Sequence, residues 1–245
     1  MALLTDNLIA FWELEEASGV RYDSEGSNNL TDNNTVTSAT GVVGDAGQFT
    51  RSNSEYLSIA DNSSLSMGDI DFTLVAWTYL DTKTNGMGIM SKFVTTGGKR
   101  EYAVEYEPSV DRFQFVVSAS GSSGTYLQAG NFGSPSTAAW IFIIAWHDSS
   151  ANTINIKVNN GTANSSSYSS GVNDDTSPFV LGATNTGAGF MDGRIDQVGV
   201  WKRVLTADEQ TFLYNSGNGR AYAGLDMPGS GSPSYGAAVG SVVMY

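Results

Sequence analysis

Short hydrophobic segments alternate along most of the chain with clusters of Gly, Asn, Asp and Ser. The segments recur about every dozen residues, which is the spacing of strands in a β-sandwich or barrel. The pattern therefore predicts an all-β protein. We expect strands near residues 8–12, 46–50, 56–60, 71–80, 87–93, 100–107, 112–118, 139–147, 153–159, 178–182 and 190–201.

The predicted strands are of two kinds. Residues 72–80 and 140–146 are apolar at nearly every position, which is typical of strands that are covered on both faces. Residues 112–118 and 153–159 alternate polar with apolar side chains, as a half-exposed antiparallel strand does. We expect the first pair to lie centrally in the fold.

One segment near the end of the domain predicts a short helix. Thr206 and Glu209 have the spacing of a capping box, in which each residue hydrogen-bonds the backbone of the other. Apolar residues 212–214 follow, and Gly217 is available to end the helix.

The C-terminal segment differs in composition from the rest of the chain. Residues 226–235 form a linker rich in Gly, Pro and Ser, and residues 236–245 are apolar and uncharged. We therefore divide the chain into a sandwich domain at 1–225 and a linker with an apolar tail at 226–245. Because a flexible spacer precedes the tail, docking on a neighbouring subunit is favoured over packing on its own domain. The residues expected to make this contact are Tyr235, Val239, Val242, Val243, Met244 and Tyr245.

Composition excludes several classes of function. The 12 Lys and Arg against 25 Asp and Glu give a net charge of −13, which argues against binding to nucleic acid or an anionic membrane. The absence of Cys excludes disulfides, thiolate metal sites and a Cys nucleophile. The chain as given has no long apolar run and no basic N-terminal region, so we expect neither a membrane span nor a signal peptide in it.

Five segments in order carry a family resemblance. They are the first strand and loop at 8–24, the glycine-punctuated turn at 41–49, the strand at 72–77, the hairpin at 140–161 and the closing segment at 190–209. Together they resemble the laminin-G-like group of the concanavalin A-like lectin/glucanase superfamily. The resemblance covers most of the sandwich domain and implies a two-sheet antiparallel jelly-roll sandwich with one short C-terminal helix. Such domains are usually non-catalytic adhesion or carbohydrate-binding modules.

The resemblance also implies a calcium site. In the family members that bind Ca²⁺, an Asp of the first loop, a backbone oxygen of the glycine turn and an Asp of the closing strand converge on the ion. The matching positions are Asp23, Gly44 or Asp45, and Asp196, with Asn28 nearby. The alternative is that Asp23 forms an Asx-turn and Asp196 hydrogen-bonds the backbone. A structural Ca²⁺ is the one cofactor that we predict.

The sequence lacks the pattern of a catalytic site. Glucanases of the superfamily carry Glu-x-Asp-x-x-Glu on one strand, which points the carboxylates into one cleft. Glu101, Glu105 and Glu107 share one face by alternation, but no Asp occupies the required position, so we expect an exposed charged face. His147 is the only histidine, which excludes a zinc site with several His ligands, and we expect it at a surface turn. We therefore predict that the protein is not an enzyme.

A sugar-binding site needs aromatic faces for stacking beside groups that hydrogen-bond hydroxyls. Most aromatic residues of a sandwich lie in its core, so only a few of them are candidates. The candidates for glycan binding are Tyr102, Tyr126, Asn131, Phe132 and Asn185.

Two functions remain open. The first is a structural or decoration protein of the adhesion type, which displays a lectin-like, glycan-binding domain on a virion or similar extracellular assembly. Its tail would bind other copies or other capsid subunits, and deletion of 226–245 would abolish that association. The second is a stand-alone carbohydrate-binding lectin module, with a polysaccharide as its partner. We expect neither nucleic acid nor a membrane as a partner in either case.

Overall fold

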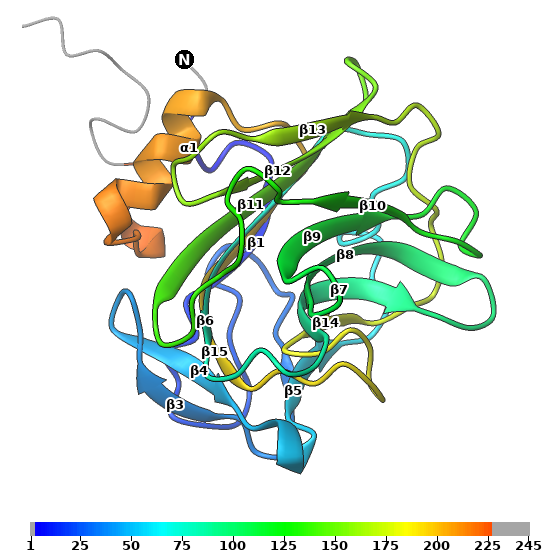
Figure 1. The fold of residues 1–245 in the computed structure, drawn as a ribbon. Coiled ribbons are helices and arrows are strands. Elements are labelled where there is room, and N and C mark those ends of the chain that lie inside the picture. Colours follow the sequence, from blue (N-terminus) through cyan, green and yellow to red (C-terminus); the bar gives the residue numbers. More distant parts are fainter. Residues whose placement is uncertain (1–2, 227–245) are drawn as a thin grey trace, which may run out of the picture.

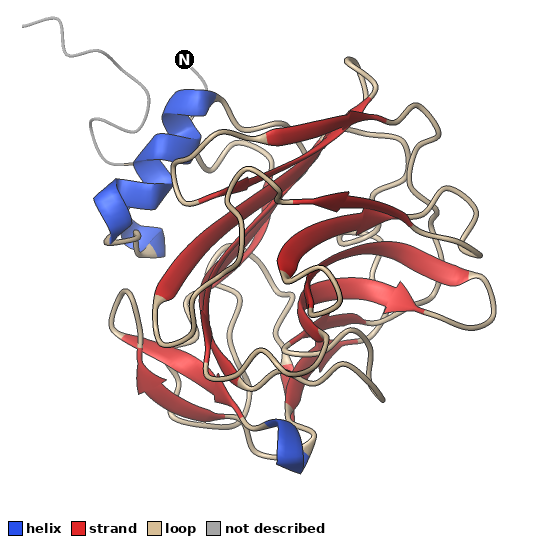
Figure 2. Cartoon of the chain, in the orientation of Figure 1, coloured by secondary structure: helices blue, strands red, loops and turns tan. Residues whose placement is uncertain are grey.

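A computed structural model describes residues 3–226 of the chain. Two antiparallel sheets pack face to face in it, with one short helix at the side (Figures 1 and 2). The residues predicted for the assembly tail, Tyr235 to Tyr245, lie outside the described part of the chain. The strands are β1 (Leu8–Trp12), β2 (Thr31–Asn33), β3 (Thr37–Thr40), β4 (Asp45–Phe49), β5 (Tyr56–Ile59), β6 (Phe72–Leu80), β7 (Met87–Val94), β8 (Lys99–Glu107), β9 (Arg112–Val117), β10 (Thr125–Gln128), β11 (Trp140–Asp148), β12 (Thr153–Val158), β13 (Asn164–Ser167), β14 (Phe179–Leu181) and β15 (Gly193–Trp201).

The strand order defines an eight-stranded and a seven-stranded sheet. The eight-stranded sheet runs β13-β12-β11-β6-β15-β4-β3, and β1 pairs with β15 beside this path. The seven-stranded sheet runs β10-β9-β8-β7-β14-β5-β2. The architecture is that of a concanavalin A-like sandwich, and every segment predicted as a strand contains one.

Large side chains from both sheets fill the space between them. Trp12 of β1 stacks on Phe179 of β14, with ring centroids 5.2 Å apart, and its indole N–H donates to the carbonyl of Asn28 at 2.8 Å. Phe72 of β6 meets Phe115 of β9 edge to face at 6.1 Å. Burying such a side chain contributes about 1.5–3 kcal/mol, so these contacts hold the two sheets together.

The other side of the eight-stranded sheet is covered as well. Helix α1 (Ala207–Tyr214) lies against it, and the ring of Tyr214 stacks on Trp77 of β6 at 5.8 Å. Leu4 and Leu225, near the two ends of the described chain, are buried in the same apolar cluster. The predicted two-sided burial of residues 72–80 and 140–146 is thus confirmed, and the eight-stranded sheet offers no open face over these strands.

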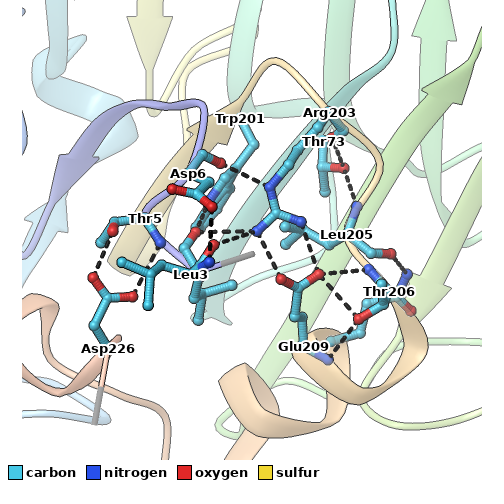
Figure 3. Close-up of polar contacts among 12 residues, drawn as sticks. Leu3, Thr5, Asp6, Thr73, Trp201, Arg203, Leu205, Thr206, Glu209 and Asp226 are labelled. Atoms are coloured by element: carbon cyan, nitrogen blue, oxygen red, sulfur yellow. Dashed lines mark hydrogen bonds and ion pairs between the residues drawn. The ribbon is translucent and has the colours of Figure 1, made fainter. Parts of the chain in front are cut away.

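A polar network fixes the helix and both ends of the described chain (Figure 3). The guanidinium of Arg203 donates to both carboxylate oxygens of Glu209, at 2.8 and 2.7 Å, and to the carbonyl of Asp6 at 2.7 Å. Thr206 and Glu209 form the predicted capping box at the start of α1. Asp226 accepts from the backbone N–H of Thr5 at 3.2 Å. This network ties α1 to residues 3–6.

The other helical elements are single turns: η1 (Arg51–Asn53), η2 (Asn215–Gly217) and η3 (Tyr222–Gly224). Helix α1 ends at Tyr214, and Asn215, which has a left-handed φ of 46°, is its C-cap residue in place of the expected Gly217. Among residues 3–226, no helix is long and apolar enough to cross a membrane.

Candidate functional site

The seven-stranded sheet has an outer face that α1 and the chain ends do not cover. Residues that pair across antiparallel strands point to the same side of a sheet. The register places Tyr102, Val104 and Phe115 toward the core, so their neighbours along β8 and β9 point outward. Two rows of side chains cross this outer face. One row is Val180, Ser91, Ala103, Val116 and Tyr126, and the other is Gly88, Glu105, Gln114 and Gln128.

The outer-face residues over β7 and β8, among them Ser91 and Ala103, are small and fully buried. The hydroxyl of Ser91 donates to the carbonyls of Ala183 and Thr184, at 3.1 and 2.8 Å, which pins the segment after β14 against β7. A Cβ on Gly88 would lie 2.1 Å from the backbone of Ala183, so only glycine permits this approach. The segment after β14 therefore lies against β7 at one end of the two rows.

Tyr126 stands at the opposite end of the rows, on the edge strand β10. Its side chain is 55% exposed, which is unusual for an aromatic residue in this fold. A Cβ on Gly124 would lie 3.1 Å from the tyrosine ring and 2.9 Å from Val116, so the ring lies directly over glycine backbone. Tyr126 thus presents an aromatic surface to solvent from a fixed position.

The second row contains a carboxylate and an amide that are hydrogen-bonded to each other. The side-chain N–H of Gln114 donates to Oε1 of Glu105 at 2.7 Å, and Gln114 is only 4% exposed. Burial raises the pKa of Glu105, and the hydrogen bond from Gln114 opposes this effect in part. Within the described residues, no hydrogen bond engages Oε2 of Glu105 or Oε1 of Gln114, and neither atom is fully buried. The pair is therefore largely buried and keeps two acceptor oxygens that have limited access to solvent, in the row next to that of Tyr126.

The glycan-binding residues predicted from the sequence lie at different places. Tyr126 lies on the outer face, whereas Tyr102 is fully buried and its hydroxyl donates to the carbonyl of Leu65 at 2.8 Å. Tyr102 is a core residue because alternation along β8 turns it inward, and its ring has no face for a sugar. Asn185 sits in a turn of the segment after β14 and accepts from the N–H of Gly187 at 2.9 Å.

Asn131 and Phe132 lie in the segment after β10 and are not members of either row. Asn131 is tied to the start of β13, since its backbone N–H donates to Oδ1 of Asn164 at 2.9 Å. Phe132 packs partly buried against the core. Sequence reasoning missed Glu105 and Gln114 as ligand groups, although the alternation of 112–118 already placed Gln114 opposite the apolar positions.

The residues predicted to hold calcium divide into two groups. Asp23 accepts four hydrogen bonds, from the N–H groups of Phe11 and Glu25 on one oxygen and from the backbone and side-chain N–H groups of Asn28 on the other, at 2.9–3.1 Å. Oδ1 of Asn28 in turn accepts from Asn62 and Ser64, both at 2.9 Å. Both oxygens of Asp23 are engaged, as the hydrogen-bonding alternative requires, and this arrangement does not fit a metal ligand.

Asp196 lies fully buried under the glycine turn. Its Oδ2 accepts from the N–H groups of Val42 and Val43, at 2.7 and 3.0 Å, while Oδ1 has no partner in the described part of the chain. Burial raises the pKa of Asp196 to about 7, and Glu15 adds to the shift. Glu15 accepts from the N–H of Asp45 at 2.8 Å.

Oδ1 of Asp196, which is buried without a partner in the described part of the chain, could bind a cation, but few other ligands lie near it. A Cβ on Gly44, which has a φ of 62°, would lie 2.3 Å from Glu15, so Glu15 is the carboxylate that joins Asp196 at this turn. Among residues 3–226, no three acidic or His side chains converge closely enough to hold a metal ion. Calcium at this turn stays a prediction that rests on Asp196.

Two sequence-based expectations about catalytic groups change with the structure. His147 is buried on β11, with Nδ1 2.8 Å from the carbonyl of Ile70, and does not lie in a surface turn. Glu101 is also fully buried, in contact with Lys92, so the charged strand face expected for Glu101, Glu105 and Glu107 does not form. A bulge between Lys92 and Phe93 breaks the alternation there.

Comparisons with known proteins agree with this fold. The family model of the concanavalin A-like lectin/glucanases superfamily matches residues 51–209. The binding domain of Paraclostridial Mosquitocidal Protein 1 superimposes with a TM-score of 0.69 at 16% identity, over 87% of this chain and 53% of that one. The ligand-binding domain of botulinum neurotoxin serotype D, in complex with N-acetylneuraminic acid, gives 0.64 at 10% identity, over 87% and 52%. The chain thus spans about half the length of these toxin domains.

A third similar structure matches along nearly its whole length. Domain 4 of AbnA, a GH43 extracellular arabinanase from Geobacillus stearothermophilus, in complex with arabinotriose, gives a TM-score of 0.60 at 16% identity, over 84% of this chain and 97% of that one. A search of curated protein sequences found no match. At these identities the solved structures support the fold, and the family match covers more than half of the chain. The protein belongs to the concanavalin A-like lectin/glucanase superfamily.

Proposed function

We propose that the protein is a non-catalytic carbohydrate-binding module whose glycan lies on the outer face of the seven-stranded sheet. The observation that carries the proposal is the exposed ring of Tyr126, which lies on the same face of the sheet as the Glu105–Gln114 pair and in the neighbouring row. An aromatic ring stacks on the apolar face of a sugar, and a buried, oriented acceptor pair takes hydrogen bonds from its hydroxyls. The outer face combines both requirements on a rigid sheet.

The similar structures support a binding role. Two of them are complexes with saccharides, arabinotriose in the arabinanase domain and N-acetylneuraminic acid in the neurotoxin domain. Several others are named as binding or receptor-binding domains of toxins. We carry over only the general class, a module that binds carbohydrate.

The arrangement of carboxylates favours binding over glycoside hydrolysis. Hydrolysis generally needs two carboxyl groups that flank the scissile bond. Glu105 is one, but Oε1 of Glu107, two residues along the same strand, accepts from the N–H of Ser109 at 2.9 Å. Glu107 therefore turns toward the β8–β9 loop instead of toward Glu105.

Saccharide titrations with matched variants test the proposal. An array of oligosaccharides that includes arabinotriose identifies a ligand, and calorimetry gives its Kd. We expect Tyr126→Ala to weaken binding about tenfold, or about 1.4 kcal/mol, because the stacking surface is lost. Tyr22→Ala is the control, since Tyr22 is 61% exposed but lies in the first loop. Equal losses in the two variants, or no saccharide bound by the wild type, would overturn the proposal.

A further inference from the structure

A second surface feature lies beside Tyr126, on the other side of strand β10. An open cleft, which we call the edge cleft, separates β10 from the end of β13. It is lined by Thr125, Ala151, Asn152, Ser167, Tyr168, Ser169 and Ser170.

The edge cleft forms where the edges of the two sheets meet. β10 and β13 each end their sheet, and the two strands contact one another (Figure 1). The segment after β10 is joined to the start of β13 by two hydrogen bonds. The backbone N–H of Asn131 donates to Oδ1 of Asn164 at 2.9 Å, and its side-chain N–H donates to the carbonyl of Ala163 at 3.0 Å. The cleft occupies the opposite end, between Thr125 and Ser167, where no such bond is formed within residues 3–226.

The lining of the edge cleft is uncharged and rich in hydroxyl groups. Thr125, Ser167, Ser169 and Asn152 are exposed, and none of their side chains is engaged in a hydrogen bond with another described residue. Tyr168 forms a fixed wall, because its hydroxyl donates to the carbonyl of Gly171 at 2.7 Å and its ring packs edge-on against His147. In a chain with a net charge of −13, such a surface suits a neutral polyhydroxyl ligand better than an ion.

The edge cleft and the outer face are joined through a single strand. Thr125 and Tyr126 are consecutive residues of β10, so their side chains point to opposite sides of it. A ligand that crosses β10 therefore reaches Tyr126 on one side and the hydroxyl groups of the cleft on the other. Linked sites of this kind strengthen binding without any new contact at either site, provided that the ligand spans both.

We infer that the edge cleft is a second subsite for the same glycan, and that the ligand is a neutral oligosaccharide of several units running from the outer face across β10. The inference rests on the proposed function, since it extends the site at Tyr126. It adds that acidic oligosaccharides are disfavoured. Glu105 lies in the first subsite, the second offers no cation, and like charges in a desolvated site repel.

Chain-length dependence tests the inference. The probes are neutral arabino-, xylo- and gluco-oligosaccharides from monosaccharide to hexasaccharide, with oligogalacturonides as the acidic series. For wild-type protein we expect Kd to fall at least about tenfold between the shortest bound and the longest neutral probe. Tighter binding of oligogalacturonides than of any neutral series would overturn the assignment of a neutral ligand.

Two variants of β13 separate the subsites. Ser167→Trp fills the edge cleft. Ser165→Trp is the control, because Ser165 points to the same side of β13 as Ser167 but does not line the cleft. Ser167→Trp should remove the gain in affinity with chain length while leaving binding of the shortest bound probe unaffected, and Ser165→Trp should keep that gain. A chain-length gain that persists in Ser167→Trp refutes the second subsite and leaves the site at Tyr126 intact.

A milder variant guards against misfolding. Ser167→Ala combined with Ser169→Ala removes polar groups from the cleft without adding bulk, and both side chains are exposed. This variant should show a smaller gain in affinity with chain length at an unchanged melting temperature. A gain as large as that of the wild type counts against the inference. Absence of binding to every probe, by contrast, refutes the proposed function itself.

Discussion

Lys92 and Glu101 bring opposite charges together in fully buried positions on β7 and β8. The ammonium of Lys92 contacts Oε1 of Glu101 and lies 2.9 Å from a carboxylate oxygen of Asp61 and 2.8 Å from the carbonyl of Asp175. Oε2 of Glu101 is buried without a partner in the described chain. A buried charge pair of this kind contributes little net stability, but its members are costly to separate.

The pH dependence of stability reports on Glu101. Burial raises its pKa from 4.5 to about 7, although Lys92 opposes the shift. The folded protein therefore binds this proton more tightly than the unfolded chain does, so the contribution of Glu101 to the free energy of unfolding falls as the pH rises from about 4.5 to about 7. In urea titrations, the free energy of unfolding of the wild type minus that of Glu101→Gln should fall over this pH range. A difference that is constant or rises with pH would contradict the shift.

Calcium binding is a prediction for Asp196. If an ion binds its orphaned oxygen, Ca²⁺ should raise the melting temperature of EDTA-treated protein through preferential binding to the folded state. Asp196→Asn keeps an acceptor for Val42 and Val43 but should abolish the response. Asp23→Asn should retain it, since both oxygens of Asp23 are already engaged. Identical melting temperatures in Ca²⁺ and EDTA would exclude the site.

At the scale of elements, the sequence predicts the central strands and misses the edges. β2, β3, β10 and β13 are short and polar, so they show neither an apolar run nor a clear alternation. Edge and near-edge strands tolerate such composition because polar side chains there suppress pairing with other chains. Both edge strands that flank the candidate subsites, β10 and β13, belong to this class. The candidate site could therefore not be assembled from the sequence, although Tyr126 itself was named.

The register between paired strands is a second feature that could not be predicted from the sequence. Glu105 and Gln114 lie on strands that were predicted, but only the pairing of β8 with β9 sets them opposite each other. The bulge beside Lys92 is likewise invisible in the sequence, because it depends on how β7 pairs with β8. Alternation alone thus placed Gln114 on the side of its strand away from the core residues, but the half-exposed strand expected at 112–118 is wrong, because residues 113–117 are all buried. It also placed Glu101 wrongly.

The capping box of α1 was predicted from sequence, and its contribution to stability is measurable. The N–H of Glu209 donates to the hydroxyl of Thr206 at 3.3 Å, and the N–H of Thr206 donates to Glu209 at 2.7 Å. Thr206→Ala should lower the free energy of unfolding by about 1 kcal/mol. Thr211→Ala, within the same helix, should change it by less than about 0.5 kcal/mol. Equal effects of the two substitutions in chemical denaturation would contradict a specific role of the cap.

For the whole molecule, net charge and the predicted tail act in opposite directions. The charge of −13 makes copies of the chain repel one another, while an apolar segment at 236–245 would favour association. Deletion of the tail should begin after Asp226, because this residue accepts from Thr5 and Leu225 is buried beneath α1. A cut one residue earlier would disturb the domain as well as the tail.

Native mass spectrometry of the full chain and of a 1–226 truncation tests the prediction that the tail mediates assembly. If the tail docks on neighbouring copies, the full chain forms oligomers and the truncation is monomeric with an unchanged melting temperature. Higher ionic strength should strengthen the oligomer in parallel sedimentation experiments, because salt screens repulsion between the acidic domains and leaves apolar contacts intact. Equal masses for the two proteins would exclude self-association through the tail. Glycan binding by the truncation should remain, since both proposed subsites lie on the sandwich.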